Sequence, residues 1–413
     1  MDIRVAVVHL PNSGSTSLVN SLTNSDFLVS RTPCTTCFPQ TASTDLDTEI
    51  TDLLKQQHLH SSGASSGLLQ PSITYIDLPG ILSQDTRSNE KLQESLQAAD
   101  VLLFLLRGFE DSSISQYYNR VDPVVELVQL YKELVTLDLS RITQVIQRNI
   151  RHKSMEAQQE IKILSGFWRY LTGYEGKEDL LQLILSGNSE IKAAGQPLGA
   201  NHLNWRHDER SCALKYNLLT SKPAVFFVNV EEYAFLRQRS RWLEPIQTYL
   251  KEHCLNWGLP TSCLLLSLAF ETRMISLKRG MFQEQQESYR AANPGFLSGL
   301  RKVTDCILES MGLIHVITLQ SQGSFTCCFC LPRETTALEV SRNLEEEISL
   351  GFVAAEVISL RDLLQYGSFE AGRKSAKFRQ VGRRHPLDDG DVIQFIYRKK
   401  IENDKNKSEV LRW

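Results

Sequence analysis

The 413-residue chain has no hydrophobic run long enough to cross a membrane. Its longest apolar runs, such as Val101–Leu106, fall far short of the roughly 20 residues that a membrane helix requires. The N-terminal sequence also lacks the basic, long apolar and small-residue regions of a secretory signal, and Ile3–Val8 instead has the pattern of a buried strand. We therefore expect a cytoplasmic protein with no membrane span.

Charge of one sign is not in excess either. The chain has 45 Lys and Arg residues against 48 Asp and Glu residues, for a formal net charge of −3. Such a chain indicates nucleic-acid binding only where positive charge gathers locally. The hydrophobic fraction of 42% and the charged fraction of 23% are typical of a globular protein and exclude wholesale disorder. The length predicts two or three domains.

Nine cysteines in a chain of this length do not suggest a disulfide-stabilised fold. Two clusters, Cys34-Thr-Thr-Cys37 and Cys327-Cys-Phe-Cys330, would each need about four ligands in one place to bind zinc. The second cluster lies in the apolar segment Ser324–Leu331, where a cysteine behaves as a small hydrophobic residue. We expect reduced structural thiols, with a zinc or redox protein as a more distant alternative.

The first part of the chain alternates strand-like and helix-like segments. Ile3–Val8, Ile73–Leu78 and Val101–Leu106 are apolar runs, and the polar segment Ser88–Ala98 between the last two is compatible with a helix. Continuous apolar strands separated by helices are typical of a parallel sheet that is covered on both faces. The sequence therefore predicts an α/β domain.

An amphipathic helical region interrupts this pattern. Apolar residues recur every three or four positions from Val124 to Ile150, and Glu156–Leu171 is a second helical stretch that could fold back on the first. We favour a projecting, coiled-coil-like hairpin over a single helix packed on the core, because the stripe is longer than a typical domain helix. The strand pattern resumes at Ala224–Val230 and Ser262–Ala269, so the helical region is an insertion.

The last hundred residues contain short strand-like runs and little helix, which predicts a small, sheet-rich C-terminal module. The expected organisation is the first half of the α/β domain at 1–122, the insertion at 123–204, the second half at 205–311, the C-terminal module at 312–398 and a charged, fraying tail at 399–413.

The segment His9–Ser17 stands where a phosphate-binding loop belongs, after the first strand and at the start of the first helix. Such a loop supplies backbone N–H groups at a helix N-terminus, a lysine for the β- and γ-phosphates and a hydroxyl for Mg²⁺. The second glycine (Gly14) and the hydroxyl (Thr16) are present, whereas His9 replaces the first glycine and Ser15 replaces the lysine. Asp77-Leu-Pro-Gly80, at the end of a later strand, stands in the place of the Asp-x-x-Gly motif that reaches Mg²⁺ and the γ-phosphate.

Together these motifs resemble those of the Obg-like ATPase (YchF-type) family, P-loop NTPases of the GTPase class that prefer ATP. Leu10-Pro-Asn-Ser-Gly14 resembles the family's Leu-Pro-Asn-Val-Gly, and Thr36 falls on its Mg²⁺-binding threonine within Pro33-x-x-Thr36-x-x-Pro39. The eukaryotic members are the closer match, through Thr220-Ser-Lys-Pro223 and Arg241-Trp-Leu243. Further matches extend over almost the whole chain: Arg107-Gly-Phe-Glu-Asp111, Arg120-Val-Asp-Pro123, Leu219-Thr-Ser-Lys-Pro223, Asn229-Val-Glu-Glu232, Ser267-Leu-Ala269, Gly351-Phe-x-x-Ala-Glu-Val357 and Leu387-x-Asp-Gly-Asp391.

The resemblance implies a P-loop G domain with a parallel sheet, a helical insertion and a C-terminal β-grasp module of the TGS type. It implies ATP, with GTP less favoured, and Mg²⁺ as cofactors, and a ribosome or RNA as the partner of a monomeric protein. Thr16 and Thr36 are the implied metal ligands, and no catalytic residue can be named. The implied nucleotide-binding residues are Asn12, Ser13, Gly14, Ser15, Thr16, Ser17, Asp77, Gly80, Asn229, Val230, Glu232, Ser267 and Ala269.

Glu232 is the residue that favours adenine. Ordinary GTPases have Asn-Lys-x-Asp where this chain has Asn229-Val-Glu-Glu232, and that aspartate accepts hydrogen bonds from guanine. Without that aspartate the N–H donors of guanine lose their acceptor, and an unpaired polar group costs about 1–3 kcal/mol. The binding preference for guanine is therefore lost. The alternative is an ordinary glutamate in the first turn of a helix.

The departures from the family pattern fall on the nucleotide machinery. Replacing the lysine by Ser15 removes a charge-assisted contact worth roughly 1.5–3 kcal/mol and the same charge in phosphoryl transfer. His9 places a side chain where backbone is expected to approach phosphate, and the segment 81–90 after Gly80 contains no glycine. The sequence thus predicts a degenerate relative with ATP hydrolysis reduced or lost. An active Mg²⁺-dependent ATPase or GTPase is the alternative.

A basic segment at 373–384 contains no acidic residue and is a candidate RNA-binding surface. Local positive charge is the footprint of phosphate-backbone contact, although such runs are often only solvated faces. The candidate RNA-binding residues are Arg373, Lys374, Lys377, Arg379, Arg383 and Arg384.

Overall fold

The computed structural model describes residues 2–30, 36–60, 70–81, 90–111, 120–152, 154–174, 180–186, 205–254, 262–279, 299–319, 325–367, 369–375, 377–400 and 408–412. Its contacts form two compact units, which are treated separately below. One unit contains 3–44 and 74–303, and the other contains 1–2, 45–73 and 304–413. Among the residues described, no helix combines the length and apolar character that crossing a membrane requires.

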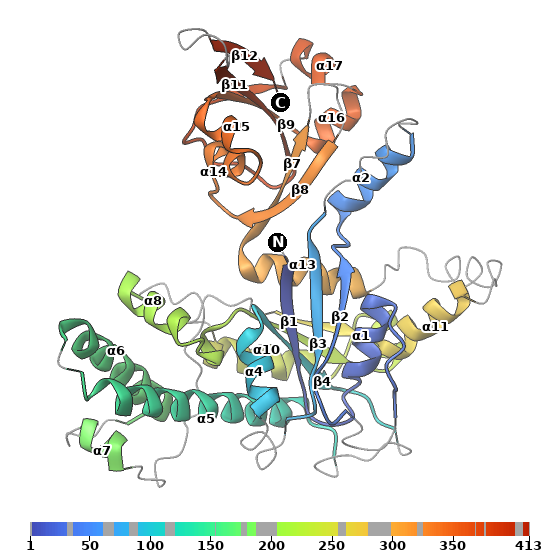
Figure 1. The fold of residues 1–413 in the computed structure, drawn as a ribbon. Coiled ribbons are helices and arrows are strands. Elements are labelled where there is room, and N and C mark those ends of the chain that lie inside the picture. Colours follow the sequence, from blue (N-terminus) through green and yellow to red (C-terminus); the bar gives the residue numbers. More distant parts are fainter. Residues whose placement is uncertain are drawn as a thin grey trace. The chain divides into compact units, whose positions relative to one another are not determined.

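A six-stranded sheet in the order β2-β3-β1-β4-β5-β6 is the framework of the first unit (Figure 1). β4 pairs in parallel with β1 and β5, and β5 pairs in parallel with β6. This confirms the predicted α/β domain with a parallel sheet. The strands are β1 (Asp2–Val8), β2 (Gln40–Asp45), β3 (Ser72–Asp77), β4 (Val101–Arg107), β5 (Ala224–Asn229) and β6 (Cys263–Leu266).

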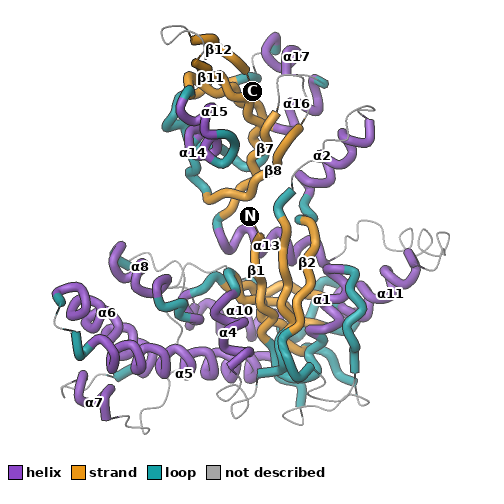
Figure 2. Tube along the Cα trace, viewed as in Figure 1, coloured by secondary structure: helices purple, strands orange, loops and turns teal. Residues whose placement is uncertain are grey.

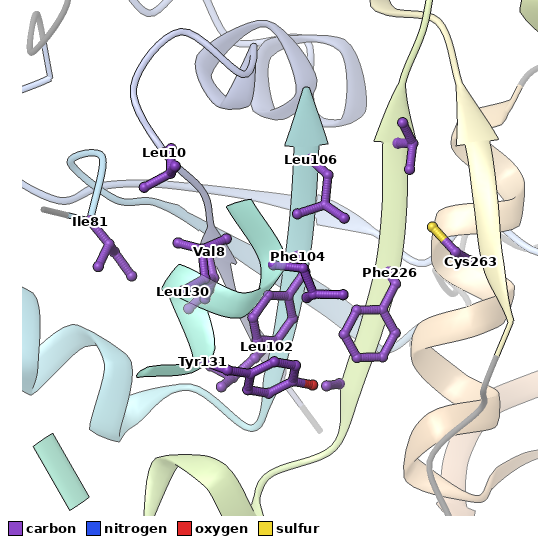
Figure 3. Close-up of a cluster of buried hydrophobic side chains, with 14 of the residues drawn as sticks. Val8, Leu10, Ile81, Leu102, Phe104, Leu106, Leu130, Tyr131, Phe226 and Cys263 are labelled. Atoms are coloured by element: carbon purple, nitrogen blue, oxygen red, sulfur yellow. The ribbon is translucent and has the colours of Figure 1, made fainter. Parts of the chain in front are cut away.

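The core on one face of this sheet is built from alternate strand residues. Leu102, Phe104 and Leu106 of β4 belong to one buried cluster, as expected when successive side chains of a strand point to opposite faces. The Phe104 ring lies 4.9 Å from Tyr131 and 5.1 Å from Phe226, measured between centroids (Figure 3). The aromatic contacts therefore hold β4, β5 and the helix that carries Tyr131 together at the centre of the domain.

Helices follow the strands as the sequence pattern indicates, and several close the core just described. α4, α10 and the helix that begins at Pro123 contribute buried leucine and isoleucine side chains to it. The helices of this part are α1 (Ser15–Thr23), α4 (Glu90–Ala98), α9 (Glu232–Leu236), α10 (Leu243–Cys254), α11 (Leu268–Arg279) and α13 (Gly299–Met311).

The helical insertion begins with α5 (Pro123–Asn149), which contributes buried side chains to two hydrophobic clusters. Asp122 caps it through Val125 N–H, and Pro123 occupies the first turn, where a missing N–H costs nothing. Its first half packs against the sheet, and its second half packs against α6 (Met155–Thr172) in a separate cluster. That cluster also includes Cys212 of α8 (His207–Lys215), beyond the predicted boundary at 204. α7 (Leu180–Ser186) and the 3₁₀ turn Leu219–Ser221 complete this region.

The C-terminal module is a second sheet, in the order β10-β9-β11-β7-β8. Its strands β7, β8, β11 and β12 are labelled in Figure 2. β7 and β11 pair in parallel, while β8, β9 and β10 pair antiparallel with their neighbours, which is the topology of a β-grasp fold. Its elements are β7 (Leu313–Leu319), β8 (Phe325–Pro332), α14 (Ala337–Arg342), α15 (Glu346–Leu350), β9 (Phe352–Ser359), α16 (Leu360–Tyr366), α17 (Phe369–Lys374), β10 (Arg379–Val381), β11 (Asp391–Lys400) and β12 (Ser408–Arg412).

The expectation of a fraying tail at 399–413 is wrong for its last part. β12 pairs antiparallel with β11, from Ile396 opposite Arg412 to Lys400 opposite Ser408. Leu411 packs against the C-terminal core, and Arg412 donates to Glu356 Oε1 at 3.1 Å. Charge composition alone suggested a solvated end, but Leu411 supplies an apolar contact and the adjacent Arg412 supplies an ion pair.

Residues 45–73, which link β2 to β3, belong to the same unit as the C-terminal sheet. Leu54 of α2 (Glu49–His60) is fully buried in a cluster with Ile317 and Ile358. His315 connects the two segments through its ring, with Nε2 3.2 Å from Thr48 Oγ1 and Nδ1 2.9 Å from Asp389 Oδ1. The sequence pattern predicted 45–73 within the first half of the α/β domain and gave no signal of this packing.

The buried Glu126 predicts a pH-dependent stability. Its Oε2 accepts a hydrogen bond from Arg107 N–H at 2.9 Å, and burial raises the pKa of the Glu126 carboxyl to about 7. The unfolded carboxyl titrates near its ordinary value of 4.5. The contribution of Glu126 to the stability of the folded chain is therefore complete below that pH, and it is lost as the pH rises through about 7, where the buried carboxyl ionises. The free energy of unfolding falls by roughly 3 kcal/mol over this pH range.

Glu126→Gln keeps an acceptor for Arg107 N–H and cannot ionise. We expect the variant to gain stability relative to the natural chain between pH 5 and pH 8, measured by urea unfolding at both values. Glu133→Gln controls for the loss of a buried carboxylate from the same helix. If the free energy of unfolding differs between the Glu126→Gln variant and the natural chain by the same amount at pH 5 and pH 8, Glu126 is not the source of the pH dependence.

Candidate nucleotide-binding site

The chain leaves β1 in a tight loop that leads directly into α1. Asn12 and Gly14 have φ values of 66° and 99°, and Leu18 N–H donates to Gly14 O at 3.0 Å in the first turn of the helix. A Cβ atom at Gly14 would lie 2.7 Å from Leu268 Cδ1, so only glycine fits this left-handed position. The unpaired N–H groups at the start of α1 can therefore face an anion.

Three predicted metal-site residues meet beside this loop. Thr16 Oγ1 donates to Asp77 Oδ2 at 2.6 Å and lies 3.4 Å from Thr36 Oγ1. Asp77 is fully buried at the end of β3, and its Oδ1 has no hydrogen-bond partner. Hydroxyl and carboxylate oxygens are hard ligands of the kind Mg²⁺ prefers. The residues present thus fit Mg²⁺, which would satisfy the buried oxygen directly or through a water molecule.

The cavity at this place is small. Its volume is about 70 Å³, whereas ligand pockets usually reach roughly 300 Å³ or more. It therefore has room for the metal and phosphate end of a nucleotide rather than for a whole one. Its walls are formed by Asn12, Gly14, Ser15, Thr16, Ser17, Leu28, Val29, Ser30, Thr36 and Gly80.

His9 does not occupy the phosphate position, so this part of the sequence interpretation is wrong. Its side chain is buried, with Nδ1 2.8 Å from Leu10 O and Nε2 2.9 Å from Leu78 O. The ring thereby connects the start of the loop to the end of β3. Ile81 N–H donates to His9 O at 2.9 Å and strengthens the same connection. A neutral imidazole carries one N–H, so the ring donates to one of these two carbonyl oxygens, and the side chain lies inward beside both.

Asn229 joins the phosphate loop to the predicted base-binding segments. Its Nδ2 donates to Ser13 O at 3.0 Å, and its Oδ1 accepts from Leu268 N–H at 3.1 Å. Val230 N–H donates to Leu266 O at 2.8 Å, which aligns the ends of β5 and β6. Ser13 is buried and its hydroxyl donates to Leu10 O, so the Ser13 side chain shapes the loop.

The remaining predicted base-site residues differ in their burial and in their partners. Ser267 is buried and its Oγ has no hydrogen-bond partner, whereas Ala269 is exposed. Glu232 begins α9, and its carboxylate pairs with Arg273 of α11, with Nη1 2.9 Å from Oε1 and 2.8 Å from Oε2. Sequence reasoning missed Arg273. The available signal was a basic residue in the helix that follows Ser267, which no motif distinguishes from a solvated charge.

The basic segment at 373–384 is neutralised in part within the C-terminal module, because three of its six cations pair with carboxylates. Four of its six cations have partners: Arg373 pairs with Glu356, Lys377 with Asp362 and Arg379 with Asp391, and Arg383 donates to Phe352 O. Lys374 and Arg384 are exposed. The segment lacks acidic residues in sequence, but the neighbouring strands and helices supply them.

The second cysteine cluster lies on β8 and is largely inside the module. Cys328 and Cys330 are 3% and 1% exposed, and burial raises the pKa of the Cys330 thiol to about 12. Within the described part of the chain, no three His, Cys, Asp or Glu side chains are placed to hold a metal ion. Cys34 of the first cluster lies outside that part.

Two family models match the chain. One, described as "50S ribosome-binding GTPase", matches residues 4–138, and YchF-GTPase_C, described as "Protein of unknown function (DUF933)", matches residues 326–397. Obg-like ATPase 1 of Homo sapiens is 24% identical over 406 residues, covering 96% of this chain and 92% of the relative. Obg-like ATPase 1 of Oryza sativa subsp. japonica is 24% identical over 399 residues, with the same coverage.

The fold agrees with these matches. The structure of the Schizosaccharomyces pombe YchF GTPase covers 95% of this chain and 97% of its own, with a TM-score of 0.69 at 20% identity. The parallel sheet and the loop between β1 and α1 define a P-loop nucleotide-binding protein of the G-domain class. Within that class, the chain is similar over nearly its whole length to the YchF/Obg-like family of P-loop NTPases.

Proposed function

We propose that this chain binds Mg²⁺-ATP weakly, prefers ATP to GTP, and hydrolyses nucleotide slowly or not at all. The observation that carries the proposal is the contact of Thr16 Oγ1 with the buried Asp77 carboxylate beside a loop that has Ser15 in place of lysine. The hydroxyl and carboxylate ligands are retained, and the fixed cation is lost.

The residues present divide the work of binding. The N–H groups at the start of α1 would donate to phosphate oxygens, where the helix dipole also favours negative charge. Thr16, Thr36 and Asp77 would hold Mg²⁺, which supplies neutralising charge to the phosphates when bound. Ser15, which is 4% exposed, supplies no charge. Hydrolysis suffers more than binding, because the transition state spreads negative charge over the γ-phosphate oxygens.

The alternative function is an active Mg²⁺-dependent ATPase or GTPase of the same family. In that case Mg²⁺, backbone N–H groups and an arginine from a partner would replace the lysine. Turnover in the presence of the partner, with little turnover in its absence, would favour this alternative.

Calorimetry with ATP and GTP in Mg²⁺ tests the proposal. We expect ATP to bind about one to two decades more weakly than to relatives that have the lysine, from the loss of a contact of roughly 1.5–3 kcal/mol. Ser15→Lys should tighten ATP binding by about tenfold or more, because His9 leaves the loop open. Ser21→Lys, which adds the same charge farther along α1, should have a much smaller effect.

A single-turnover hydrolysis assay on the same samples completes this test. Tight ATP binding with rapid turnover in the natural chain would contradict the proposal of weak binding and slow hydrolysis. It would support the alternative of an active ATPase. Absence of any ATP or GTP binding, in the natural chain and in the Ser15→Lys variant alike, would overturn nucleotide binding itself.

We further propose that the protein associates with a ribosome or RNA in the cytoplasm, as a monomer whose C-terminal β-grasp module is of the TGS type. Support comes from the family description "50S ribosome-binding GTPase" and from the β-grasp topology. Lys374 and Arg384 are exposed and lie apart from the ion pairs and the carbonyl contact that hold the other four cations of the basic segment. The paired arginines could exchange their carboxylate partners for phosphate groups.

Co-sedimentation with ribosomal fractions over a range of salt concentrations tests this association. Binding should fall steeply with salt because phosphate contacts release counterions. Lys374→Glu with Arg384→Glu should release the protein, while the matched double reversal Lys251→Glu with Lys302→Glu, outside the C-terminal module, should not. Unchanged co-sedimentation of the first variant would exclude this surface.

A further inference from the structure

The ends of β5 and β6 bring an acidic and a basic side chain together at the predicted base site. Asn229, the last residue of β5, accepts from Leu268 N–H, the first residue of α11. Glu232 starts α9 three residues after Asn229, and Arg273 lies on α11. Ligands of open α/β sheets bind at the carboxyl ends of the strands, so the Glu232–Arg273 pair stands where a base would be read.

The pair engages the whole carboxylate. Arg273 Nη1 lies 2.9 Å from Glu232 Oε1 and 2.8 Å from Oε2. The Glu232 side chain is 18% exposed and that of Arg273 is 54% exposed, so the carboxylate is the more enclosed partner. A base that donates hydrogen bonds to Glu232 must compete with a guanidinium group whose charge already offsets that of the carboxylate.

We propose that Arg273 is a specificity-determining residue, which acts by holding the carboxylate of Glu232 away from the donor edge of guanine. This inference rests on the proposed function, because it assigns a role within the nucleotide site. Guanine presents two adjacent N–H donors to a carboxylate, and adenine does not. Sequestering Glu232 therefore lowers the affinity for GTP and leaves the affinity for ATP nearly unchanged. Arg273 is a positioning residue, since it acts through Glu232.

The ratio of the dissociation constants for Mg²⁺-GTP and Mg²⁺-ATP tests the role of Arg273. Arg273→Ala should shift this ratio toward GTP by about tenfold, the effect of one charge-assisted hydrogen bond. Arg273→Lys can still pair with Glu232 and should keep most of the natural ratio. Glu232→Ala combined with Arg273→Ala should show no shift, because the freed acceptor is absent. Thermal unfolding of each variant reports on the fold separately.

The outcomes separate this inference from the function on which it rests. If the natural chain binds ATP and Arg273→Ala leaves the ratio unchanged, the inference is overturned and the proposed function stands. If the ratio shifts equally in Arg273→Ala and in the double variant, Glu232 is not the group through which Arg273 acts, and the inference is again overturned. If the natural chain and all variants bind neither nucleotide, both proposals fail.

Discussion

The buried carboxylate of Asp77 is the constraint on which the nucleotide site depends. It is fully enclosed at the end of β3, and only Oδ2 is satisfied, by Thr16 Oγ1 at 2.6 Å. Leaving the other oxygen buried without a partner costs free energy. A hard cation held by Thr16, Thr36 and Asp77 would satisfy this oxygen. The substitutions at His9 and Ser15 leave this arrangement in place.

The rest of the α/β domain positions these oxygens through backbone connections. Asn229 ties the phosphate loop to the ends of β5 and β6, and His9 ties it to the end of β3. Thr36 precedes β2 and Asp77 ends β3, and the segment between these strands, 45–73, packs in the other unit through Leu54. The segment that packs with the C-terminal module is therefore covalently joined to the strands that flank Thr36 and Asp77.

The sequence predicted the fold well because its signals were strong and local. Continuous apolar strands, the stripe from Val124 to Ile150 and the loop after β1 each specify an element without knowledge of the others. It also predicted that Thr16, Thr36 and Asp77 would meet, since family motifs fix their positions on adjacent elements. It failed where a partner comes from a distant segment. The carboxylates that neutralise Arg373 and Arg379, and the packing of Leu54 on the C-terminal sheet, have no local signature.

His9 and Arg273 illustrate the same limit within the site. A histidine in place of glycine suggests a blocked loop, but the direction of its side chain depends on two carbonyl oxygens, one of them on a different strand end. Arg273 is ordinary as a sequence position and becomes informative only because it meets Glu232. Motif matching identifies which residues are present, whereas their partners decide what each of them can bind.

The proposed function requires that the site retain a Mg²⁺-dependent phosphate interaction without a lysine. The most direct measurement is the affinity for ATP with Mg²⁺ and with a chelator, in the natural chain and in the Asp77→Asn variant. We predict that Mg²⁺ tightens ATP binding in the natural chain and that this gain is lost in the variant, whose folded structure persists by circular dichroism. Equal ATP affinity with and without Mg²⁺ in the natural chain, or a full Mg²⁺ effect in the Asp77→Asn variant, would contradict the account.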